Sequence, residues 1–256
     1  MIYYLNRGLI IEQVIAQELE RYIDQIHMDE TYPNFHIHVT NNHPFAELYL
    51  HTTVAAADIF PSVVVTSETD QKTGELMQVA EEATAIGCDL NDFNELIGEV
   101  DKLPGVCTLI DPITEEEIRK AFEKKAVLYG IKIDQFNTDR ISIEIWADNN
   151  QLKNEVYEQF RTYIKGGMQK VLQELYKGYG LSYFDGTVRG ERSNNYNVDF
   201  DLILTGAHIG FEINYVTSQI ILDTEIAAEN IKDIETEVIN HVKNERYSGD
   251  FNNRRK

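Results

Sequence analysis

Residues 126–146 alternate between apolar and polar side chains, and this period of two constrains the fold more than any other stretch of the chain. Ala126 to Asp134 and Arg140 to Trp146 are predicted to be two strands, because successive side chains of a strand point to opposite faces. The intervening residues, Phe136 to Asp139, predict the turn of a β-hairpin. One face of this hairpin would hold isoleucines at 141, 143 and 145, and the other would face water.

Apolar residues at helical spacing predict two helices before this region. The first covers residues 8–27, and its stripe consists of Ile11, Ile15, Leu19, Tyr22 and Ile26. The second begins with a capping box at Thr114 to Glu117, in which the threonine hydroxyl accepts a hydrogen bond from the Glu117 amide and the Glu117 carboxylate reaches back. This helix is expected to end near Lys125.

Two further helices are predicted after the alternating region. Asp148, followed three residues later by Gln151, is expected to cap a long helix. Gly166-Gly167 predicts a bend or break in that helix, and residues 178–180 predict its end. An acidic helix from about Asp223 is expected to precede a flexible tail at 247–256. Its apolar stripe consists of Ile231, Ile234, Val238 and Val242.

Several apolar or β-branched segments are predicted to be strands. They are residues 35–39, 61–66, 181–184, 198–204 and 209–222. Residues 45–60 fit either a helix or a strand, since Thr52 to Val54 favours a strand and Ala55 to Ala57 favours a helix. Residues 67–112 mix charged residues with scattered glycine and proline, and we interpret them as an irregular, peripheral insertion.

Together these elements predict an α+β protein with a mainly antiparallel sheet and helices packed on one face, plus the peripheral insertion. The expected division is 1–66 for the N-terminal helix and strands of the core, 67–112 for the insertion, 113–246 for the main core and 247–256 for the tail. A chain of 256 residues, 43% of them hydrophobic, is long enough to bury a core without disulfides. Cys88 and Cys107 are therefore interpreted as reduced, buried thiols.

The charge of the chain restricts its partners. It has 43 acidic and 23 basic residues, for a formal net charge of −20. A protein that coats duplex DNA must neutralise phosphates with cationic side chains, so that class is not expected. Neither a signal peptide nor an apolar run of 18 residues occurs, so we expect a soluble protein made in a cytoplasm, with no membrane partner.

The residues that could carry chemistry do not form a complete motif. His36, His38, His43 and His51 lie close together in the sequence, but no carboxylate or cysteine completes a ligand shell, so no metal site is expected. Because the nucleotide-binding and hydrolase patterns GxGxxG, GxxxxGK[ST], GxSxG and HExxH do not occur, we assign no cofactor and no catalytic residue.

One enzymatic alternative stays open. Asp199 and Asp201 would share one face of a strand, and Glu212 would lie on the next. Three such carboxylates are typical of metal-dependent nucleases, in which they hold the cation. Carboxylates at a period of two are equally typical of a solvated sheet face.

A polar, glycine-containing arm from Asp185 to Tyr196 separates two apolar strands. Twelve such residues bury too little surface to order themselves, so we expect the arm to contact a neighbouring subunit or docking partner rather than its own chain. An ordinary surface loop is the alternative. Together with the polar turn after Trp146, the arm supplies the predicted interface residues, which are Asp148, Asn149, Asn150, Arg189, Glu191, Arg192, Asn194 and Asn195.

The order of elements over residues 126–226 resembles that of tail-terminator and neck proteins of long-tailed bacteriophages. The likeness rests on the hairpin, the Asp148-Asn149-Asn150 turn, the long helix, and the segments Phe200 to Leu204 and Ile209 to Ile213. That family forms closed rings, usually hexameric, which join the tail tube to the head and leave a lumen for DNA. The resemblance implies a homo-oligomer that contacts tail tube, sheath or connector proteins, with DNA only as passing cargo and no catalytic residues.

Three hypotheses follow for the function. The first is a structural virion protein, a tail terminator or neck ring whose acidic lumen lets DNA slide through without adhering. The second is a phage-encoded nuclease or other enzyme that uses Asp199, Asp201 and Glu212. The third is a monomeric binding module.

Overall fold

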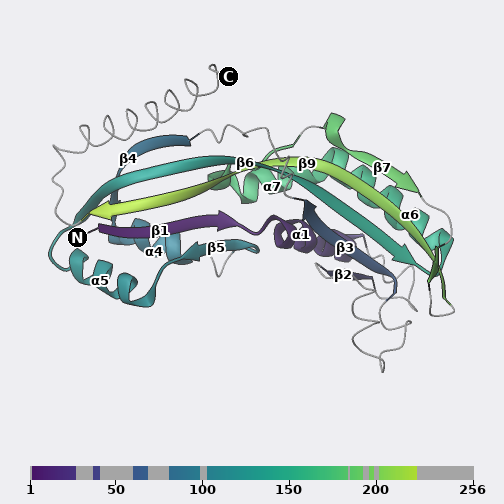
Figure 1. Ribbon diagram of the computed structural model, residues 1–256, viewed down its shortest axis with the longest axis horizontal. Coiled ribbons are helices and arrows are strands. Elements are labelled where there is room, and N and C mark those ends of the chain that lie inside the picture. Colours follow the sequence, from purple (N-terminus) through teal and green to yellow (C-terminus); the bar gives the residue numbers. More distant parts are fainter. Residues whose placement is uncertain are drawn as a thin grey trace, which may run out of the picture. The chain divides into compact units, whose positions relative to one another are not determined.

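The computed structural model describes residues 2–26, 37–40, 60–68, 81–98, 103–183, 185–192, 196–198 and 202–223 (Figure 1). Two long strands dominate it, β6 (Val127–Ala147, 21 residues) and β9 (Leu202–Asp223, 22 residues), whereas strands of globular proteins usually have about 3–10 residues. The fold is α+β with a mixed, mostly antiparallel sheet, as the sequence predicted. The chain forms two compact units, and both strands contribute residues to each.

The first unit contains 1–8, 77–136 and 216–256. Its strands are β1 (Ile2–Leu9), β4 (Glu81–Asp89), β5 (Val106–Leu109) and parts of β6 and β9. β4 pairs antiparallel with β6, from Glu81 opposite Gln135 to Asp89 opposite Val127. β1 pairs antiparallel with the end of β9 and neighbours β5 on its other side.

Two helices, α4 (Leu90–Gly98) and α5 (Pro112–Phe122), complete the core of the first unit. Phe93 of α4 and Ile118 of α5 are fully buried, and their cluster includes residues of the four strands β1, β4, β6 and β9. The strand members are Tyr3, Leu5, Cys88, Leu128, Ile220 and Leu222. One face of the sheet is therefore sealed by apolar packing, which is the main favourable term in folding.

The second unit contains 9–76 and 137–215. β2 (His38–Thr40) pairs parallel with β3 (Ser62–Glu68), and β3 pairs antiparallel with β6. Beyond β6 lies β9, whose first half also pairs with β7 (Arg189–Arg192) and β8 (Tyr196–Val198). The alternation of β6 is confirmed, because its isoleucines at 141, 143 and 145 are buried while Ser142 and Glu144 are only half-buried.

Helices α1 (Ile11–Gln25) and α6 (Asn150–Tyr163) belong to the second unit. The helix predicted at 8–27 is thus confirmed, shorter at both ends. α1 packs against β3 with the predicted stripe, of which Ile11, Ile15 and Leu19 are buried. Its N-terminal neighbour 2–9 is a strand that the sequence analysis did not predict.

The predicted hairpin at 126–146 is wrong, because Phe136 to Asp139 continue the strand instead of turning. None of these four residues is a glycine that would favour the positive φ of a tight hairpin turn. Their polar side chains instead bond to β9. The Thr138 hydroxyl donates to Asn214 Oδ1 at 2.7 Å, and Asp139 accepts from the Tyr215 hydroxyl at 2.9 Å. The predicted strands at 198–204 and 209–222 likewise differ, since β9 is continuous from Leu202 to Asp223.

Both predicted helix caps are displaced by one or more residues. α5 begins at Pro112, and its cap is Asp111, whose carboxylate accepts from the Ile113 amide at 2.7 Å. Proline suits the first helical position because its missing N–H has no partner to lose there. α6 is capped by Asn149 rather than Asp148, through bonds to the amides of Gln151 at 2.8 Å and Leu152 at 3.2 Å.

The glycine pair does not break the long helix. After α6 the chain passes through a π-helical turn, η2 (Ile164–Met168), and continues as α7 (Gln169–Leu175). A Cβ at Gly167 would approach the Tyr163 ring at 2.9 Å, so glycine allows the close packing of this turn. The predicted stop is confirmed, since a short 3₁₀ turn, η3 (Lys177–Tyr179), leads to Gly180 with a φ of 56°.

Residues 67–112 are more regular than predicted. Their described part contains the end of β3, then β4, α4 and β5, and both β4 and β5 are strands of the first unit's sheet. The scattered glycines misled the prediction, because Gly87 lies inside β4 and Gly98 ends α4. Of segment 181–184, the described residues 181–183 form only an isolated bridge between Ser182 and Asn214. Residues 45–59, the helix predicted from Asp223 onward and the tail at 247–256 lie outside the described residues.

Gly130→Ala is expected to lower the free energy of unfolding by about 1–3 kcal/mol, because a Cβ at this position would overlap the backbone carbonyl of Ile221. Gly166→Ala is the matched control, since a Cβ there meets nothing within 4 Å and alanine favours a helix by up to about 1 kcal/mol. Urea denaturation followed by circular dichroism measures both. Equal stability of the two variants would contradict the close approach of β6 and β9.

Candidate functional site

The histidine group predicted from the sequence is described only in part. His38 lies in β2 and is half-buried, while His36, His43 and His51 lie outside the described residues. Within the described ranges, no three His, Cys, Asp or Glu side chains gather as metal ligands would. No helix among the described residues is both long and apolar enough to cross a bilayer.

Only one member of the possible carboxylate trio is described. Asp199 and Asp201 lie outside the described residues. Glu212 lies on β9 with an exposed side chain, and its carboxylate is 3.5 Å from Nη2 of Arg140 on β6. The nuclease hypothesis thus stays a prediction, with a guanidinium beside the one carboxylate that can be placed.

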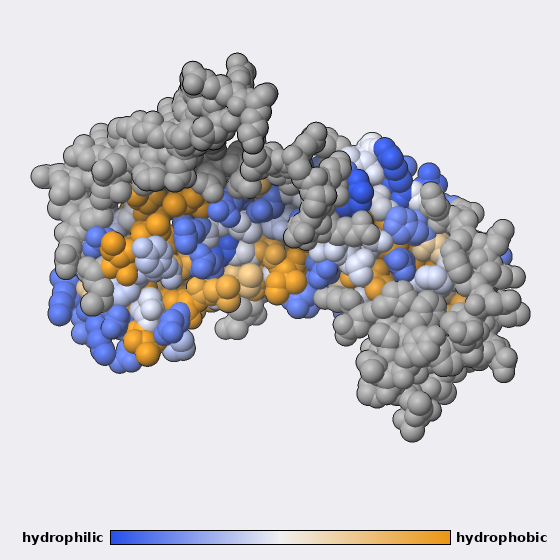
Figure 2. Space-filling model, viewed as in Figure 1, coloured by the Kyte–Doolittle hydropathy of each residue, from blue (hydrophilic) through white to orange (hydrophobic). Residues whose placement is uncertain are grey.

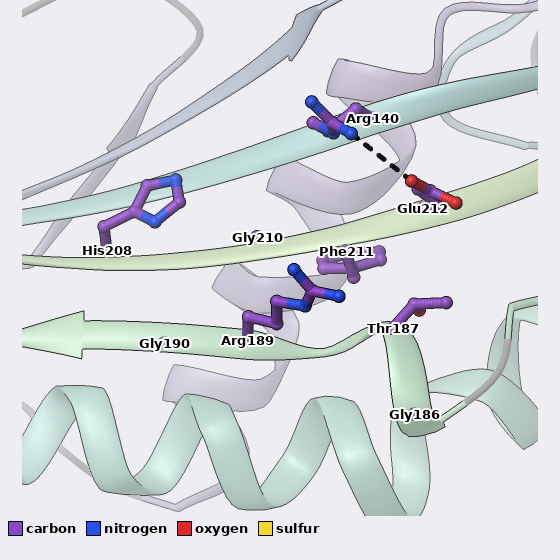
Figure 3. Close-up of a pocket in the computed structure, with 9 residues that line it drawn as sticks. All are labelled: Arg140, Gly186, Thr187, Arg189, Gly190, His208, Gly210, Phe211 and Glu212. Carbon is purple, nitrogen blue, oxygen red and sulfur yellow. Dashed lines mark hydrogen bonds and ion pairs between the residues drawn. The ribbon is translucent and has the colours of Figure 1, made fainter.

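A pocket of about 400 Å³ surrounds this ion pair, and we call it the cationic pocket (Figure 3). It lies entirely within the second unit. Its lining comes from β6, β7, β9 and the 3₁₀ turn η4 (Asp185–Thr187). The residues are Arg140, Gly186, Thr187, Arg189, Gly190, His208, Gly210, Phe211 and Glu212.

The register of β7 on β9 creates the space of the pocket. Arg189 stands opposite Gly210, and directly opposed residues of an antiparallel pair project on the same face. Gly210 has no side chain, whereas His208 and Glu212, two positions away on either side, project on that same face. The Arg189 side chain therefore has room between the His208 and Glu212 side chains, next to Gly210 (Figure 3). Gly190 is required here, because a Cβ would overlap the hydroxyl of Tyr157 from α6.

The charges of the pocket are unbalanced. Arg140 is matched by Glu212, and a ring nitrogen of His208 lies 2.9 Å from the Ser142 hydroxyl oxygen. Arg189 has no ion pair with any residue that the structure describes, and its side chain is exposed. The pocket thus offers an available guanidinium in a chain whose formal net charge is −20.

The polar arm does fold back on its own chain in its described part, so that expectation was wrong. Residues 189–192 pair with 207–210 of β9, so these four residues find backbone partners in their own chain. Glu191 and Arg192 belong to this ladder, although their side chains are not described, and Asn194 and Asn195 lie outside the described residues. An interface role for these residues stays a prediction.

The turn between β6 and α6 presents a second predicted interface residue, Asp148. Asn149 is engaged as the cap of α6, and Asn150 is the first, exposed residue of the helix. The Asp148 side chain is exposed and makes no hydrogen bond or ion pair with the described residues. The cap fixes the backbone on either side of this carboxylate.

Sequence reasoning missed Arg140 and His208 as residues of the cationic pocket. A signal existed for Arg140, since it precedes Ser142 and Glu144 on the wet face of the alternating pattern. For His208 the neighbours were not visible, because they lie 66 and more positions away on β6.

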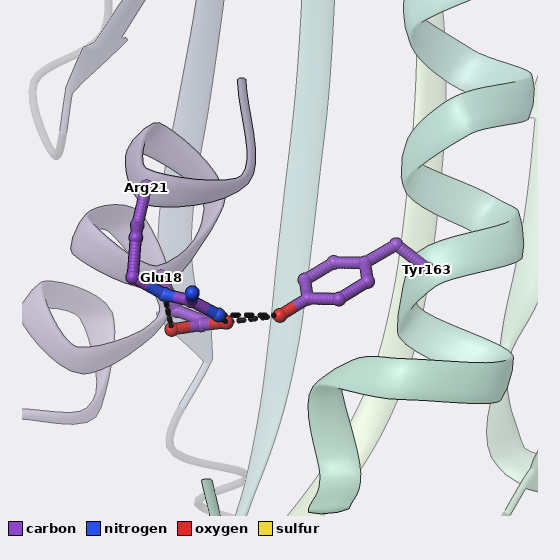
Figure 4. A network of polar contacts seen from close by, with 3 residues as sticks. All are labelled: Glu18, Arg21 and Tyr163. Carbon is purple, nitrogen blue, oxygen red and sulfur yellow. Dashed lines mark hydrogen bonds and ion pairs between the residues drawn. The ribbon is translucent and has the colours of Figure 1, made fainter. Parts of the chain in front are cut away.

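A partly buried polar network joins α1 to α6 within the second unit (Figure 4). Glu18, only 5% exposed, accepts from Arg21 Nε at 2.8 Å and from the hydroxyl of Tyr163, which in turn lies 3.1 Å from Arg21 Nη2. Burial, reinforced by the bond to Glu18, raises the pKa of Tyr163 above its ordinary value. The Tyr163 ring also stacks on Tyr22 of α1, with centroids 3.9 Å apart. All three polar groups are paired, so the network serves to hold the two helices together.

The face of the first unit's sheet opposite its core carries many apolar side chains, together with the polar Asn6 and Asp223. Ile2 and Tyr4 of β1 are 52% and 55% exposed, and Leu109 of β5 is 67% exposed. The strand registers place further side chains on the same face of the sheet. One lies on β9, beside Tyr4, and the others lie on β6 and β4, on the side opposite the buried Leu128 and Cys88. These are Ile221, Val127, Tyr129, Ile133, Ala83 and Ala85. Figure 2 shows apolar residues at the surface in the region where Figure 1 places β1. We call this surface the apolar sheet face.

The two cysteines are free thiols, in agreement with the sequence analysis. Cys88 is buried as predicted, whereas Cys107 is only half-buried. Burial, together with the charges of Asp92 and Asp89, raises the pKa of the Cys88 thiol to about 12. Because the thiolate is the reactive form, Cys88 is poorly suited to nucleophilic chemistry.

The chain matches no protein-family model and no curated protein.

Glu18→Ala is expected to lower the free energy of unfolding by about 1–3 kcal/mol, because it leaves Arg21 and the Tyr163 hydroxyl without their buried acceptor. Glu20→Ala removes an exposed carboxylate from the same helix and serves as the control, with a change within about 0.5 kcal/mol. Thermal and urea unfolding measure the difference. A Glu18→Ala protein as stable as the control would show that the network contributes nothing.

At pH 8 a disulfide reagent such as dithionitrobenzoate is expected to modify Cys107 well before Cys88, since Cys88 is buried and holds little thiolate. The Cys107→Ser protein should therefore react slowly and the Cys88→Ser protein rapidly. Absorbance of the released thiol gives both rates. Faster reaction of Cys88 would contradict its burial.

Proposed function

We propose that this chain is a structural virion protein, a tail terminator or neck component that assembles into a homo-oligomeric ring between tail tube and head. The order of elements predicted over residues 126–226 is the origin of the proposal, although its hairpin is a single strand, β6, in the structure. Of the described features, the apolar sheet face supports it best. Solvent-exposed apolar patches of this kind mark contacts with other proteins, because apolar surface gains free energy when it leaves water.

The charge of the chain is compatible with this role. A ring that passes DNA must not bind it tightly, and a formal charge of −20 per copy disfavours contact with phosphates. The contacts between copies must then overcome like-charge repulsion. Apolar surfaces such as the one around Tyr4 and Leu109 can supply that attraction without adding charge.

A ring also needs contacts between two different surfaces of adjacent copies. The apolar sheet face belongs to the first unit, and the cationic pocket belongs to the second. Two chemically distinct candidate surfaces on one chain support such head-to-tail assembly.

The protein is expected in purified virions of a phage that the producing bacterium releases, at the junction of head and tail. Immunogold labelling of gradient-purified particles locates it, and mass spectrometry of the particles counts copies relative to the portal protein. Absence from intact virions would overturn the proposal.

The apolar sheet face can be tested in the same particles. The double variant Ile2→Lys with Tyr4→Lys should lower incorporation at least tenfold, because lysine at a buried contact is strongly unfavourable. Thr162→Lys with Gln173→Lys adds the same charge at exposed positions of α6 and α7 and should be incorporated normally. Circular dichroism of each purified variant separates lost assembly from lost folding.

A further inference from the structure

We propose that Asp148 of one copy binds in the cationic pocket of the next copy, between Arg189 and Arg140. This inference rests on the proposed self-assembly and names the polar contact within it. It joins a carboxylate and a guanidinium that the described chain leaves unpaired.

The pocket is suited to a carboxylate in charge and in shape. It holds two guanidinium groups and an imidazole against the single carboxylate of Glu212. Arg140 and Glu212 are 3.5 Å apart and both about half exposed, which is a loose pair that can share its guanidinium with a second acceptor. Arginine offers a planar fork of donors that matches a carboxylate. The open position above Gly210 leaves space for the incoming group.

Asp148 is suited to be the incoming group. It follows the last residue of β6, and the Asn149 cap holds the turn that displays it. Its carboxylate is exposed and has no partner among the described residues. A capped turn places this charge with little loss of conformational freedom on binding.

Asp148 does not reach the pocket of its own copy. Arg140 lies eight positions earlier, and the intervening residues belong to the single strand β6. At about 3.4 Å per residue, the two positions are separated by roughly 27 Å. The pocket that Asp148 can bind is therefore the pocket of a second copy.

A contact between two different surfaces has the symmetry that a ring requires. Each copy would offer one carboxylate and one pocket, so every copy could bind two neighbours. Within a chain of net charge −20, the available guanidinium of Arg189 also limits where another copy can approach. The pair would thus fix the register of copies that the apolar surface attracts.

Charge reversal tests the proposal through sedimentation velocity over a range of concentrations. Asp148→Arg and Arg189→Asp are each expected to weaken self-association about tenfold or more, because each places like charges in the contact. The controls Glu174→Arg and Lys170→Asp make the same charge changes at exposed positions of α7 and should leave it unchanged. Thermal melting checks that every variant is folded.

The decisive measurement is an equal mixture of the two reversed proteins. Where the two proteins alternate, two kinds of contact form. In one, the arginine introduced at position 148 faces the aspartate introduced at position 189. In the other, the wild-type Asp148 faces the wild-type Arg189. Association of the mixture should recover to within about threefold of wild type, because opposite charges again face each other. Failure of the mixture to recover, or an effect of only one reversal, would overturn the pairing, since another group would then occupy the pocket.

Further outcomes separate this inference from the proposed function. If the wild-type protein associates and both reversed variants associate as strongly as their controls, the pocket contact is rejected and the virion assignment still stands. Incorporation of the same variants into virions is scored in parallel, so that assembly occurring only on the tail is also measured. A monomer that is absent from virions would overturn both. Binding of a labelled DNA duplex that Arg189→Asp abolishes would instead assign the pocket to phosphate.

Discussion

The pairing of β6 with β9 is the interaction on which the rest of the structure depends. Each strand contributes residues to both compact units, and the two strands are neighbours at the centre of the sheet. Their close approach at Gly130 and Ile221 allows no Cβ, and the bonds from Thr138 and Asp139 to β9 keep the centre of β6 extended. Every other strand is added to this pair, directly or through one neighbour.

Local patterns in the sequence predicted which faces are buried better than where elements begin and end. The isoleucines of β6 and the stripe of α1 were identified because burial imposes a period of two or of 3.6 on the residues themselves. The continuity of β6 was not predictable from Asn137, Thr138 and Asp139, which are common turn residues. Their extended conformation depends on partners some 76 positions away in the chain.

The strand β1 and the cationic pocket were also not predictable from local sequence patterns. Ile2 to Leu9 carries apolar residues on both faces, so no alternation marked it as a strand. The polar arm that contains Arg189 stood out in the sequence. Its position beside Arg140 and His208 depends on the register of β7 on β9, which sequence reasoning did not predict. The site therefore belongs to the sheet rather than to any contiguous motif.

The pairing of β1 with β9 also bears on how the protein is made. Residues 2–7 pair with 218–223, so β1 is synthesised well before its partner, which lies 211 to 221 positions later in the chain. Until β9 has been synthesised, the edge of β1 that faces β9 has no strand to pair with, even though β5 on its other side is already present. Contacts between distant residues also slow folding, because the chain must close a long loop before they form. A translational pause before residue 218 would prolong the time in which β1 is open to chaperones and to aggregation.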